Sequence, residues 1–240
     1  MSDSEDEKIF LFPGEEVKEA EEASSKKKVI IGPGLQGNLK ENRVWASRGG
    51  ELCMKKNTTF WLNSHQKRYV PAKGDTVIGY VTGKSTDTFR VDIGGSEPAS
   101  LSYLAFEGAT KRNRPEVNVG DIVFARLLVA SGDVEPELVC LDSTGLKKDR
   151  FGTLPIDGFV FECSINLCRK MLDDKFPLTR ALAKEYRFEM AVGVNGRIWV
   201  RGHNLRQTIG LCHAILGVEH VRKTDLDDYC RNIISELAGF

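Results

Sequence analysis

The sequence predicts a chain of several small domains, mainly β at first and mixed α and β toward its C-terminus. Residues 29–72 hold short β-prone pieces separated by glycine, and residues 73–143 hold five longer ones. Residues 144–240 alternate between β-prone and helix-prone runs. Because 240 residues are enough for two or three small domains, we expect three domains with these boundaries after an acidic tail over residues 1–28.

The composition is that of an ordinary globular protein. Hydrophobic residues make up 41% of the chain, and no apolar run approaches the ~18 residues that a membrane-spanning helix needs. The N-terminus is acidic and so unlike a secretory signal, and we expect the chain to stay inside the cell. The six cysteines include no Cys-x-x-Cys pair and the four histidines do not complete a zinc site, which predicts reduced, mostly buried thiols and neither metal nor cofactor.

The net charge of zero hides an uneven distribution along the chain. Residues 1–22 carry 2 basic and 9 acidic side chains, whereas the rest of the chain carries 32 basic and 25 acidic ones. A positive body of this kind is compatible with a polyanionic partner. Residues 1–28 contain too few apolar side chains to offset the entropy lost on ordering, so we expect most of this tail to be disordered.

The first β-region, residues 29–72, is typical of hairpins in a small antiparallel module. Pieces such as VIIGPGL, RVWAS and TTFWLN alternate polar and apolar side chains over about five residues each. Gly32-Pro33-Gly34 predicts a turn, because proline fixes φ and glycine permits positive φ. A module of this size is only marginally stable alone, so we expect it to pack against a neighbouring domain or another subunit.

The second β-region predicts a closed Greek-key barrel of the oligonucleotide-binding (OB) fold. Five β-segments fall in about 70 residues, with glycines where a tightly coiled sheet must bend. This region also resembles the S1 RNA-binding domain. The pattern Gly-Asp-x-Val-x-Gly-x-Val of that domain is reproduced at residues 74–81, Val-Asp-Ile-Gly at 91–94 and Ala-x-Leu at 99–101.

Aromatic side chains of the predicted barrel are candidate RNA-stacking residues. An S1 barrel holds single-stranded RNA by stacking bases on exposed aromatic rings while cations follow the phosphate backbone. Phe89, Tyr103 and Phe106 lie on or beside the second and third strands. Alternate strand positions must also fill the barrel, so a core position is the competing interpretation for each ring.

A cluster of cations precedes the fourth strand of the predicted barrel. Lys111, Arg112 and Arg114 fall within four residues and are followed by Pro115, which predicts an exposed loop that could face phosphates. The surrounding segment is net acidic, so RNA would meet a local basic spot and not a broad positive face. Contact with RNA and contact with a protein neighbour both remain open for this loop.

The C-terminal region has the predicted order strand, helix, helix, strand, strand, helix, which is that of a eukaryotic-type (type I) KH domain. We expect Asn166 to cap its first helix and Pro177 to limit the start of its second. In RNA-binding KH domains a Gly-x-x-Gly loop between these helices lets backbone amides approach phosphates. Residues 173–176, Asp-Asp-Lys-Phe, contain no glycine and two carboxylates, so the usual RNA clamp is missing.

Gly193, Asn195 and Gly196 belong to a stretch that resembles the missing clamp but falls between two predicted strands. Asn-Gly between β-segments is a strong hairpin signal, because a type I′ turn needs positive φ at both central residues. We therefore predict a structural turn centred on Asn195 and Gly196. Trp199 on the return strand is expected to pack against a neighbouring face as a large hydrophobic anchor.

Together these modules resemble the S1/KH cap subunits of the eukaryotic RNA exosome, of the exosome component 3 kind. The similarity spans about residues 29–240 and includes the strings GPGL, QKRYVP, GGSEPASLSYLAFEGATKRNRP and GVNGRIWV. In that family the motif matched by Gly193, Asn195 and Gly196 is regarded as structural. The acidic tail lies outside the similarity.

The resemblance implies a non-catalytic subunit without a cofactor. It would hold together a ring of RNase PH-like proteins and line the RNA entry channel for 3′–5′ RNA processing and decay. The implied partners are the ring subunits, other S1 cap subunits, an associated exonuclease and single-stranded RNA, bound weakly by the chain alone. The implied location is nucleus, nucleolus and cytoplasm. The candidate ring contact consists of Gly32, Pro33, Gly34 and Leu35.

Two other functions are weighed against this one. A metal-dependent nuclease needs several carboxylates that converge on two cations, whereas Asp75, Asp92, Asp121 and Asp142 are scattered at strand ends. A free-standing S1-type RNA-binding factor, for example one associated with translation or the ribosome, would bind RNA with submicromolar affinity that falls steeply with salt.

Overall fold

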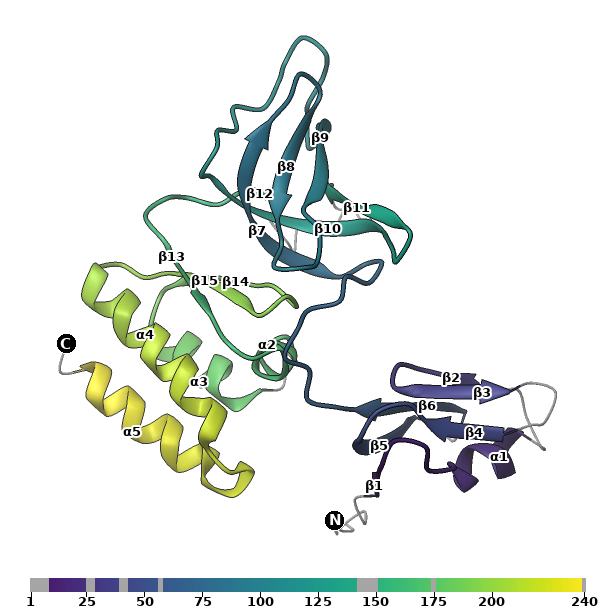
Figure 1. Cartoon of the computed structure of the whole chain (residues 1–240). Coiled ribbons are helices and arrows are strands. Elements are labelled where there is room, and N and C mark those ends of the chain that lie inside the picture. Colours follow the sequence, from purple (N-terminus) through teal and green to yellow (C-terminus); the bar gives the residue numbers. More distant parts are fainter. Residues whose placement is uncertain are drawn as a thin grey trace. The chain divides into compact units, whose positions relative to one another are not determined.

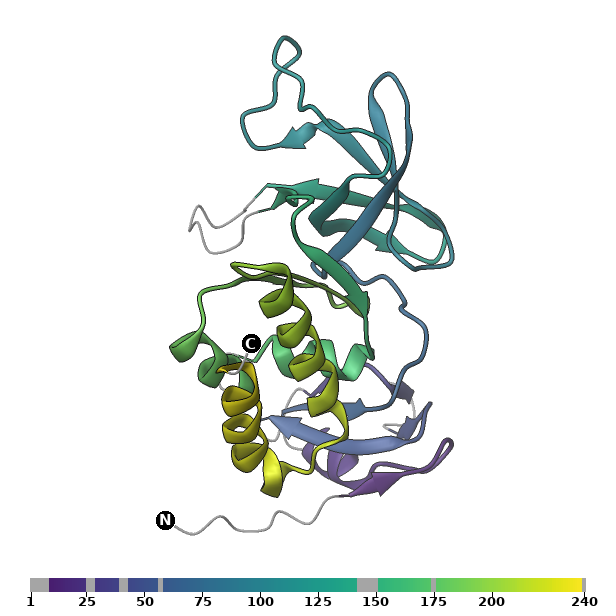
Figure 2. The same ribbon diagram turned by 90° about the vertical axis from the view of Figure 1, so that its left-hand side faces the viewer.

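The protein is described from a computed structural model, which describes residues 9–24, 29–38, 43–55, 58–141, 151–173 and 176–238. The chain forms two compact units, Met1–His65 and Gln66–Phe240, which are taken in turn below. Figure 1 labels the helices and strands, and Figure 2 shows the same ribbon from the side.

The first unit is a small β-module with one helix among its described residues. Its elements are β1 (Phe10–Leu11), α1 (Lys18–Ser24), β2 (Ile30–Ile31), β3 (Leu35–Asn38), β4 (Arg43–Ala46), β5 (Gly50–Lys55) and β6 (Thr59–Asn63). One sheet has the order β1-β5-β6-β2, and β3 and β4 pair antiparallel as a second sheet. The pairing of β5 with β6 is antiparallel as predicted, but β2 pairs with β6 in parallel, so the prediction of an antiparallel module is wrong for this pair.

The prediction of a disordered tail is wrong for residues 9–24. Strand β1 pairs with β5, and Val17 and Ala20 are fully buried in the core of the first unit. The few apolar side chains of this acidic stretch are therefore used against Phe60 and Leu62, the burial that the composition alone undercounts. Residues 1–8 and 25–28 lie outside the described residues.

The second unit begins with the predicted barrel. Its strands are β7 (Thr76–Lys84), β8 (Thr88–Asp92), β9 (Ala99–Phe106), β10 (Ile122–Ser131), β11 (Val134–Cys140) and β12 (Gly152–Thr153). The sheet order is β11-β9-β8-β7-β10-β12, and β10 also pairs with β11. The parallel pairing of β11 with β9 and the pairing of β10 with β11 close the strands into a barrel, as the sequence predicts.

The barrel extends beyond its predicted boundaries of residues 73 and 143. Tyr69 is buried in the barrel core, and β12 pairs with β10 through Thr153 opposite Val123. The segment that carries the predicted boundary at residue 143 lies outside the described residues. The pattern of strand-forming residues alone could not place a two-residue edge strand such as β12.

The C-terminal domain of the second unit has the predicted order of elements. These are β13 (Phe159–Glu162), α2 (Ile165–Met171), α3 (Pro177–Glu185), β14 (Glu189–Val192), β15 (Arg197–Arg201), α4 (Leu205–Gly217), η1 (Val218–His220), η2 (Lys223–Asp225) and α5 (Leu226–Ala238). The sheet order is β13-β15-β14, with both neighbours antiparallel to β15. Helices α3, α4 and α5 lie on the side of the sheet away from the barrel (Figures 1 and 2).

The helix starts in this domain follow local chemistry. Ser164 and not Asn166 caps α2, because its hydroxyl accepts a hydrogen bond from the Leu167 N–H at 3.0 Å. Pro177 is the first residue of α3, where its missing N–H costs no hydrogen bond. Pro177 thus marks the end of the α2–α3 connection, in which a KH domain places its RNA clamp.

Candidate nucleic-acid interface

The three aromatic candidates for base stacking are buried inside the barrel. Phe89 is 4% exposed, Tyr103 9% and Phe106 8%. The rings of Phe89 and Phe106 meet edge to face with centroids 6.2 Å apart, as in a packed core. The structure therefore corrects this part of the predicted interface: the inward strand positions fill the barrel, and these rings offer no stacking surface.

The guanidinium of Arg114 contacts the barrel itself. Its guanidinium carbon lies 4.5 Å from the centre of the Tyr103 ring, and its Nη1 donates to the Thr86 carbonyl at 3.0 Å. This arrangement covers the outer part of Tyr103 and ties the β9–β10 connection to the β7–β8 turn. Arg114 retains an exposed edge, but its first role is to hold this loop in place.

Lys111 and Arg112 are presented by a defined turn. The Thr110 N–H donates to the Asn113 carbonyl at 2.9 Å, and the Asn113 N–H donates to the Thr110 hydroxyl at 3.0 Å. The two cations occupy the central positions between these residues, and both are exposed. The turn thus places two mobile positive charges on the surface without burying either.

The connection between α2 and α3 has no glycine-based clamp. The Phe176 N–H donates to the Asp173 carbonyl at 2.9 Å. Phe176 packs against the core of the C-terminal domain. Residues 174 and 175, the centre of the position predicted to lack the clamp, lie outside the described residues.

The turn between β14 and β15 contains Gly193, Asn195 and Gly196 and is structural, although it is not the predicted type I′ turn. The Gly196 N–H donates to the Gly193 carbonyl at 3.3 Å, so Val194 and Asn195 are the central residues. Gly196 follows with a φ of +84°, the left-handed conformation that glycine adopts at low cost. This is the three-residue hairpin pattern, in which a left-handed glycine comes after the turn.

The side chain of Asn195 joins the turn to the barrel domain through hydrogen bonds. Its amide accepts from the Ile78 N–H at 3.2 Å and donates to the Ile78 and Ile93 carbonyls at 2.8 Å each. Asn195 is only 8% exposed, and the neighbouring Val194 N–H donates to the Thr76 carbonyl at 2.8 Å. The turn thereby pairs with β7 almost as an additional strand would, and it joins the two domains of the second unit.

A buried arginine reinforces this junction. Arg197 is 7% exposed and donates through Nη1 to the Asp92 carbonyl and through Nη2 to the Asp92 carboxylate, both at 2.8 Å. Its guanidinium carbon lies 5.0 Å from the centre of the Tyr80 ring. Burial alone would raise the pKa of Asp92, but the hydrogen bonds from Arg197 and Gly94 and the Arg197 charge lower it overall.

Trp199 anchors the same junction through apolar contact. It is 2% exposed and packs in one cluster with Ala191 of β14 and with Ile78 and Phe124 of the barrel. Gly158 lies so close to the indole that a Cβ at this position would overlap it. The predicted anchor role of Trp199 agrees with this position, and the neighbouring face is that of the barrel.

Sequence reasoning missed the partners of this junction. Asp92 was considered in the Val-Asp-Ile-Gly pattern and among the scattered carboxylates, and Ile78 was considered only within a strand. The available signal was the break in alternation at the adjacent apolar residues Val77 and Ile78 of β7, which are both fully buried and face two different cores. A strand buried on both faces indicates a neighbouring domain.

The predicted ring-contact turn in the first unit is mostly internal. Leu35 is 7% exposed, and Gly34 has a φ of +86° with a would-be Cβ only 2.7 Å from the Leu62 Cβ. The Pro33 carbonyl accepts from the Leu62 N–H at 3.0 Å. Leu35 therefore stabilises its own unit, and Pro33 is the exposed member of the predicted set.

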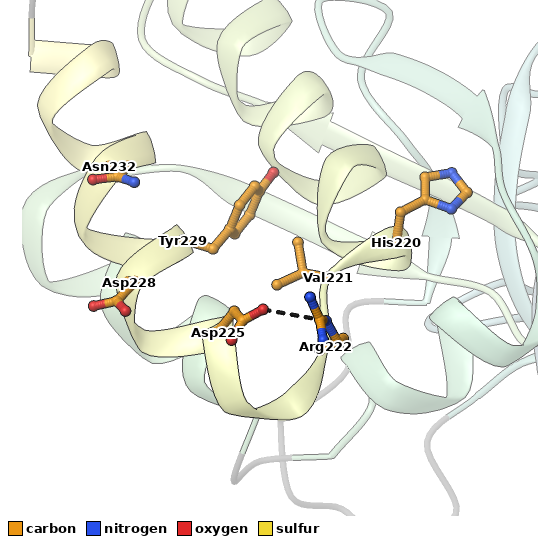
Figure 3. Close-up of a pocket in the computed structure, with 7 residues that line it drawn as sticks. All are labelled: His220, Val221, Arg222, Asp225, Asp228, Tyr229 and Asn232. Carbon is orange, nitrogen blue, oxygen red and sulfur yellow. Dashed lines mark ion pairs between the residues drawn. The ribbon is translucent and has the colours of Figure 1, made fainter.

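An open pocket lies where the η1–η2 segment meets α5 (Figure 3). Arg222 and Asp225 pair across it at 3.5 Å, and the Tyr229 hydroxyl donates to the Ala214 carbonyl at 2.9 Å. Arg222, Asp225 and Tyr229 thus have partners within the domain, and Asp228 pairs with Arg231 outside the pocket. Among the described residues no three His, Cys, Asp or Glu side chains gather at a common point, and no helix there is long and apolar enough to cross a membrane.

Two family models match the second unit. Residues 69–152 match the S1 domain of exosome complex component RRP40, and residues 158–206 match a KH domain. These matches agree with the barrel and with the C-terminal domain seen in the structure. They also agree with the start of the barrel before residue 73.

Several curated proteins resemble the chain over most of its length. Exosome complex component RRP40 of Drosophila melanogaster is 46% identical over 224 residues, which cover 93% of this chain and 95% of that protein. The Homo sapiens protein of the same name is 43% identical over 90% of this chain and 78% of its own length. The Saccharomyces cerevisiae protein is 34% identical over 86% of this chain and 87% of its own.

A solved structure shares the fold. It is a protein named as an exosome complex RNA-binding protein, with a TM-score of 0.55 and 21% identity. The match covers 71% of this chain and 97% of the other.

Proposed function

The chain belongs to the exosome complex component RRP40 family, and from this membership we propose that it is a non-catalytic RNA-binding subunit at the cap of an exosome. In this role it stabilises a ring of RNase PH-like subunits and lines the path by which RNA enters. A separate exonuclease performs 3′–5′ processing and decay. The complex acts in the nucleus, nucleolus and cytoplasm.

The observation that carries the proposal is the use of the Gly193–Gly196 hairpin turn. A glycine-containing loop that could have approached phosphates is buried against β7 through Asn195, and the loop in the clamp position has no glycine. The C-terminal domain therefore serves as a support for the barrel and not as an independent RNA clamp. Such an arrangement suits a subunit that lines a channel built by several proteins.

RNA contact is assigned to the turn of Lys111 and Arg112. Both side chains are exposed, whereas Phe89, Tyr103 and Phe106 are buried, so the contact rests on phosphate charge and not on base stacking at these rings. Contacts of this kind are independent of RNA sequence and weaken as salt screens them. We therefore expect the chain alone to bind single-stranded RNA weakly.

Protein contact is assigned to the first unit, with Pro33 as the exposed residue of its candidate turn. Large apolar side chains stand exposed on its edge strands and beside them: Phe10 is 65% exposed, Phe12 75% and Ile30 60%. Phe10 and Phe12 lie at one edge of the sheet and Ile30 lies at the opposite edge, and apolar groups that gather at an edge are typical of a surface that a partner covers. The partners proposed for this surface are the ring subunits and the other S1 cap subunits.

Purification of the chain from cells tests the assembly. We expect it to recover with ring and cap subunits, and recovery as a lone monomer would overturn the proposal. An autonomous RNA-binding factor would instead show submicromolar affinity for RNA as an isolated protein, with steep loss of affinity as salt rises.

Crosslinking of RNA to the assembled complex tests the contact site. The variant Lys111→Ala/Arg112→Ala should lower crosslinking about tenfold at low salt, since each phosphate contact contributes roughly one unit to the salt slope. The matched control Lys184→Ala/Arg187→Ala removes two exposed cations from the C-terminal domain and should leave crosslinking unchanged. If both variants lost crosslinking equally, the 111–112 turn would contribute only through the overall positive charge and would not be a specific contact site.

A further inference from the structure

Two cysteines meet at the start of α2. The sulfur atoms of Cys163 and Cys168 lie 3.3 Å apart, within contact distance. Cys163 stands just before the cap residue Ser164, and Cys168 lies in the first turn of the helix. Side chains at these two helical positions commonly pack together as a hydrophobic staple, which explains why the fold brings the two sulfurs together.

The two thiols differ in access to solvent. Cys163 is half-buried, whereas Cys168 is fully buried. Cys163 is therefore the more accessible residue of the two, and its sulfur is in contact with that of Cys168. An accessible thiol next to a second thiol in contact is the arrangement of a cysteine pair that oxidation can join.

The pair is also attached to the junction between the two domains. The Cys163 N–H donates to the Gly196 carbonyl at 2.8 Å, and Gly196 follows Asn195 in the turn that enters the barrel. A bond between the two sulfurs would fasten the chain leaving β13 to the first turn of α2. It would thus stiffen the base of the turn that carries Asn195.

We propose that Cys163 and Cys168 form an oxidative modification site, at which hydrogen peroxide joins the two sulfurs in a reversible disulfide. Cys163 attacks the peroxide oxygen, the O–O bond breaks, and a sulfenic acid and one water form. Cys168 then attacks the Cys163 sulfur, its proton leaves with the hydroxyl as a second water, and the S–S bond forms. The dithiol loses two electrons and the peroxide gains two, and an external thiol reverses the bond.

The environment of Cys163 sets the expected rate. Its hydrogen bond with Cys168, its burial and the nearby Cys168 and Glu219 all raise its pKa. The thiol is therefore neutral near pH 7, and its oxidation is slower than that of an exposed thiolate. This protects the pair under ordinary conditions and restricts its oxidation to strong peroxide exposure.

Other cysteines of the chain provide internal references. Burial raises the pKa of Cys140 to about 12 and that of Cys212 to about 11, so both thiols are neutral near pH 7, as Cys163 is. Cys53 is half-buried like Cys163 but lies in the first unit, with the Glu51 carbonyl as its partner at 3.8 Å. Residues 1–65 contain no other cysteine, so Cys53 is the matched control for a half-buried thiol.

The test treats the full chain with millimolar hydrogen peroxide, blocks the remaining thiols with N-ethylmaleimide and maps the peptides by mass spectrometry. We expect the peptide that holds Cys163 and Cys168 to lose two hydrogens and to take no maleimide, and dithiothreitol to restore both thiols. In Cys168→Ser, dimedone should trap a sulfenic acid at Cys163. Cys53→Ser should bridge as the unaltered chain does.

Two results would overturn the proposal. One is maleimide on both Cys163 and Cys168 after a peroxide exposure that oxidises Cys53. The other is conversion of Cys163 to sulfinic acid in the unaltered chain with no bridged peptide. The mapping of the unaltered chain decides the matter even where Cys168→Ser fails to fold, because a purely structural staple forms no bridge.

Discussion

Two loops of the C-terminal domain, the α2–α3 connection and the β14–β15 turn, differ in the use of glycine. The first stands where an RNA-binding KH domain places its clamp, yet residues 173–176 contain none. The second has Gly193 and Gly196, and its Asn195 is buried against Ile78 and Ile93 of the barrel. Glycine lets a loop approach another backbone closely. In this protein that backbone belongs to the barrel, whereas in an RNA-binding KH domain it belongs to RNA.

The largest effect is expected from Asn195→Ala. The substitution removes three hydrogen bonds and leaves the Ile78 N–H and two buried carbonyls without partners, which costs about 3–5 kcal/mol of unfolding free energy. Urea denaturation of the full chain, followed by tryptophan fluorescence, measures the loss. A cost below about 1 kcal/mol would mean that the turn does not hold the two domains together.

Gly196→Val is expected to cost about 3 kcal/mol. A β-branched residue is strained at a φ of +84°, and its Cβ would stand 2.9 Å from the Cys163 carbonyl. The same denaturation experiment measures it. Gly132→Val provides the control, because a Cβ there meets nothing within 4 Å and Gly132 has no positive φ. If both variants lost the same unfolding free energy, the left-handed conformation of Gly196 would not be what makes the β14–β15 turn sensitive to substitution.

Asp92→Asn should cost less than about 1 kcal/mol at pH 7, because the carboxylate is 45% exposed and its ion pair with Arg197 is screened. The pKa of Asp92 is lowered in the fold, so its contribution is present above the ordinary Asp value near 4 and is lost as pH falls through the lowered value. The stability difference between the unaltered chain and Asp92→Asn should therefore shrink below pH ~4.

Denaturation at a series of pH values checks this dependence. Glu162→Gln is the matched control, since Glu162 faces Arg197 at 3.5 Å but is 79% exposed, and its effect should be smaller still. A difference that grows toward acid would contradict the assigned sign.

The smallest effect is expected from Asp173→Gly, which places a glycine at the first position of the clamp loop. The change in unfolding free energy should stay below about 1 kcal/mol, the cost of added backbone freedom. RNA affinity, measured by fluorescence anisotropy on the full chain, should change less than about twofold, since one glycine does not supply the positive surroundings of a clamp. A large gain in affinity would show that the loop is a dormant RNA site.

The sequence predicted the domain content because each domain has a strong local pattern. The closed barrel follows from five β-segments with glycines at the bends, and the C-terminal domain follows from its strand and helix order and from Pro177. The α2 cap was assigned to Asn166 although Ser164 holds it, since both residue types cap helices equally well. Boundaries of this kind depend on geometry that composition does not contain.

The site was less predictable than the fold. Gly193, Asn195, Gly196 and Trp199 were recognised as structural, but the hairpin type and the barrel partner were not, because both depend on contacts between residues about 100 positions apart, as between Asn195 and Ile93. The burial of the three aromatic candidates was hard to predict for a local reason. A ring on a barrel strand faces inward or outward according to a register that the sequence leaves open by one residue.

The helix α1 has a practical consequence for where this protein can be shortened. A chain trimmed to begin at residue 29 would discard Val17 and Ala20 together with strand β1, and it would uncover the faces of Phe60 and Leu62 that they shield. Such a fragment would expose apolar core surface to solvent. A shortened chain should therefore begin before residue 9, so that residues 9–24 remain packed on the core of the first unit.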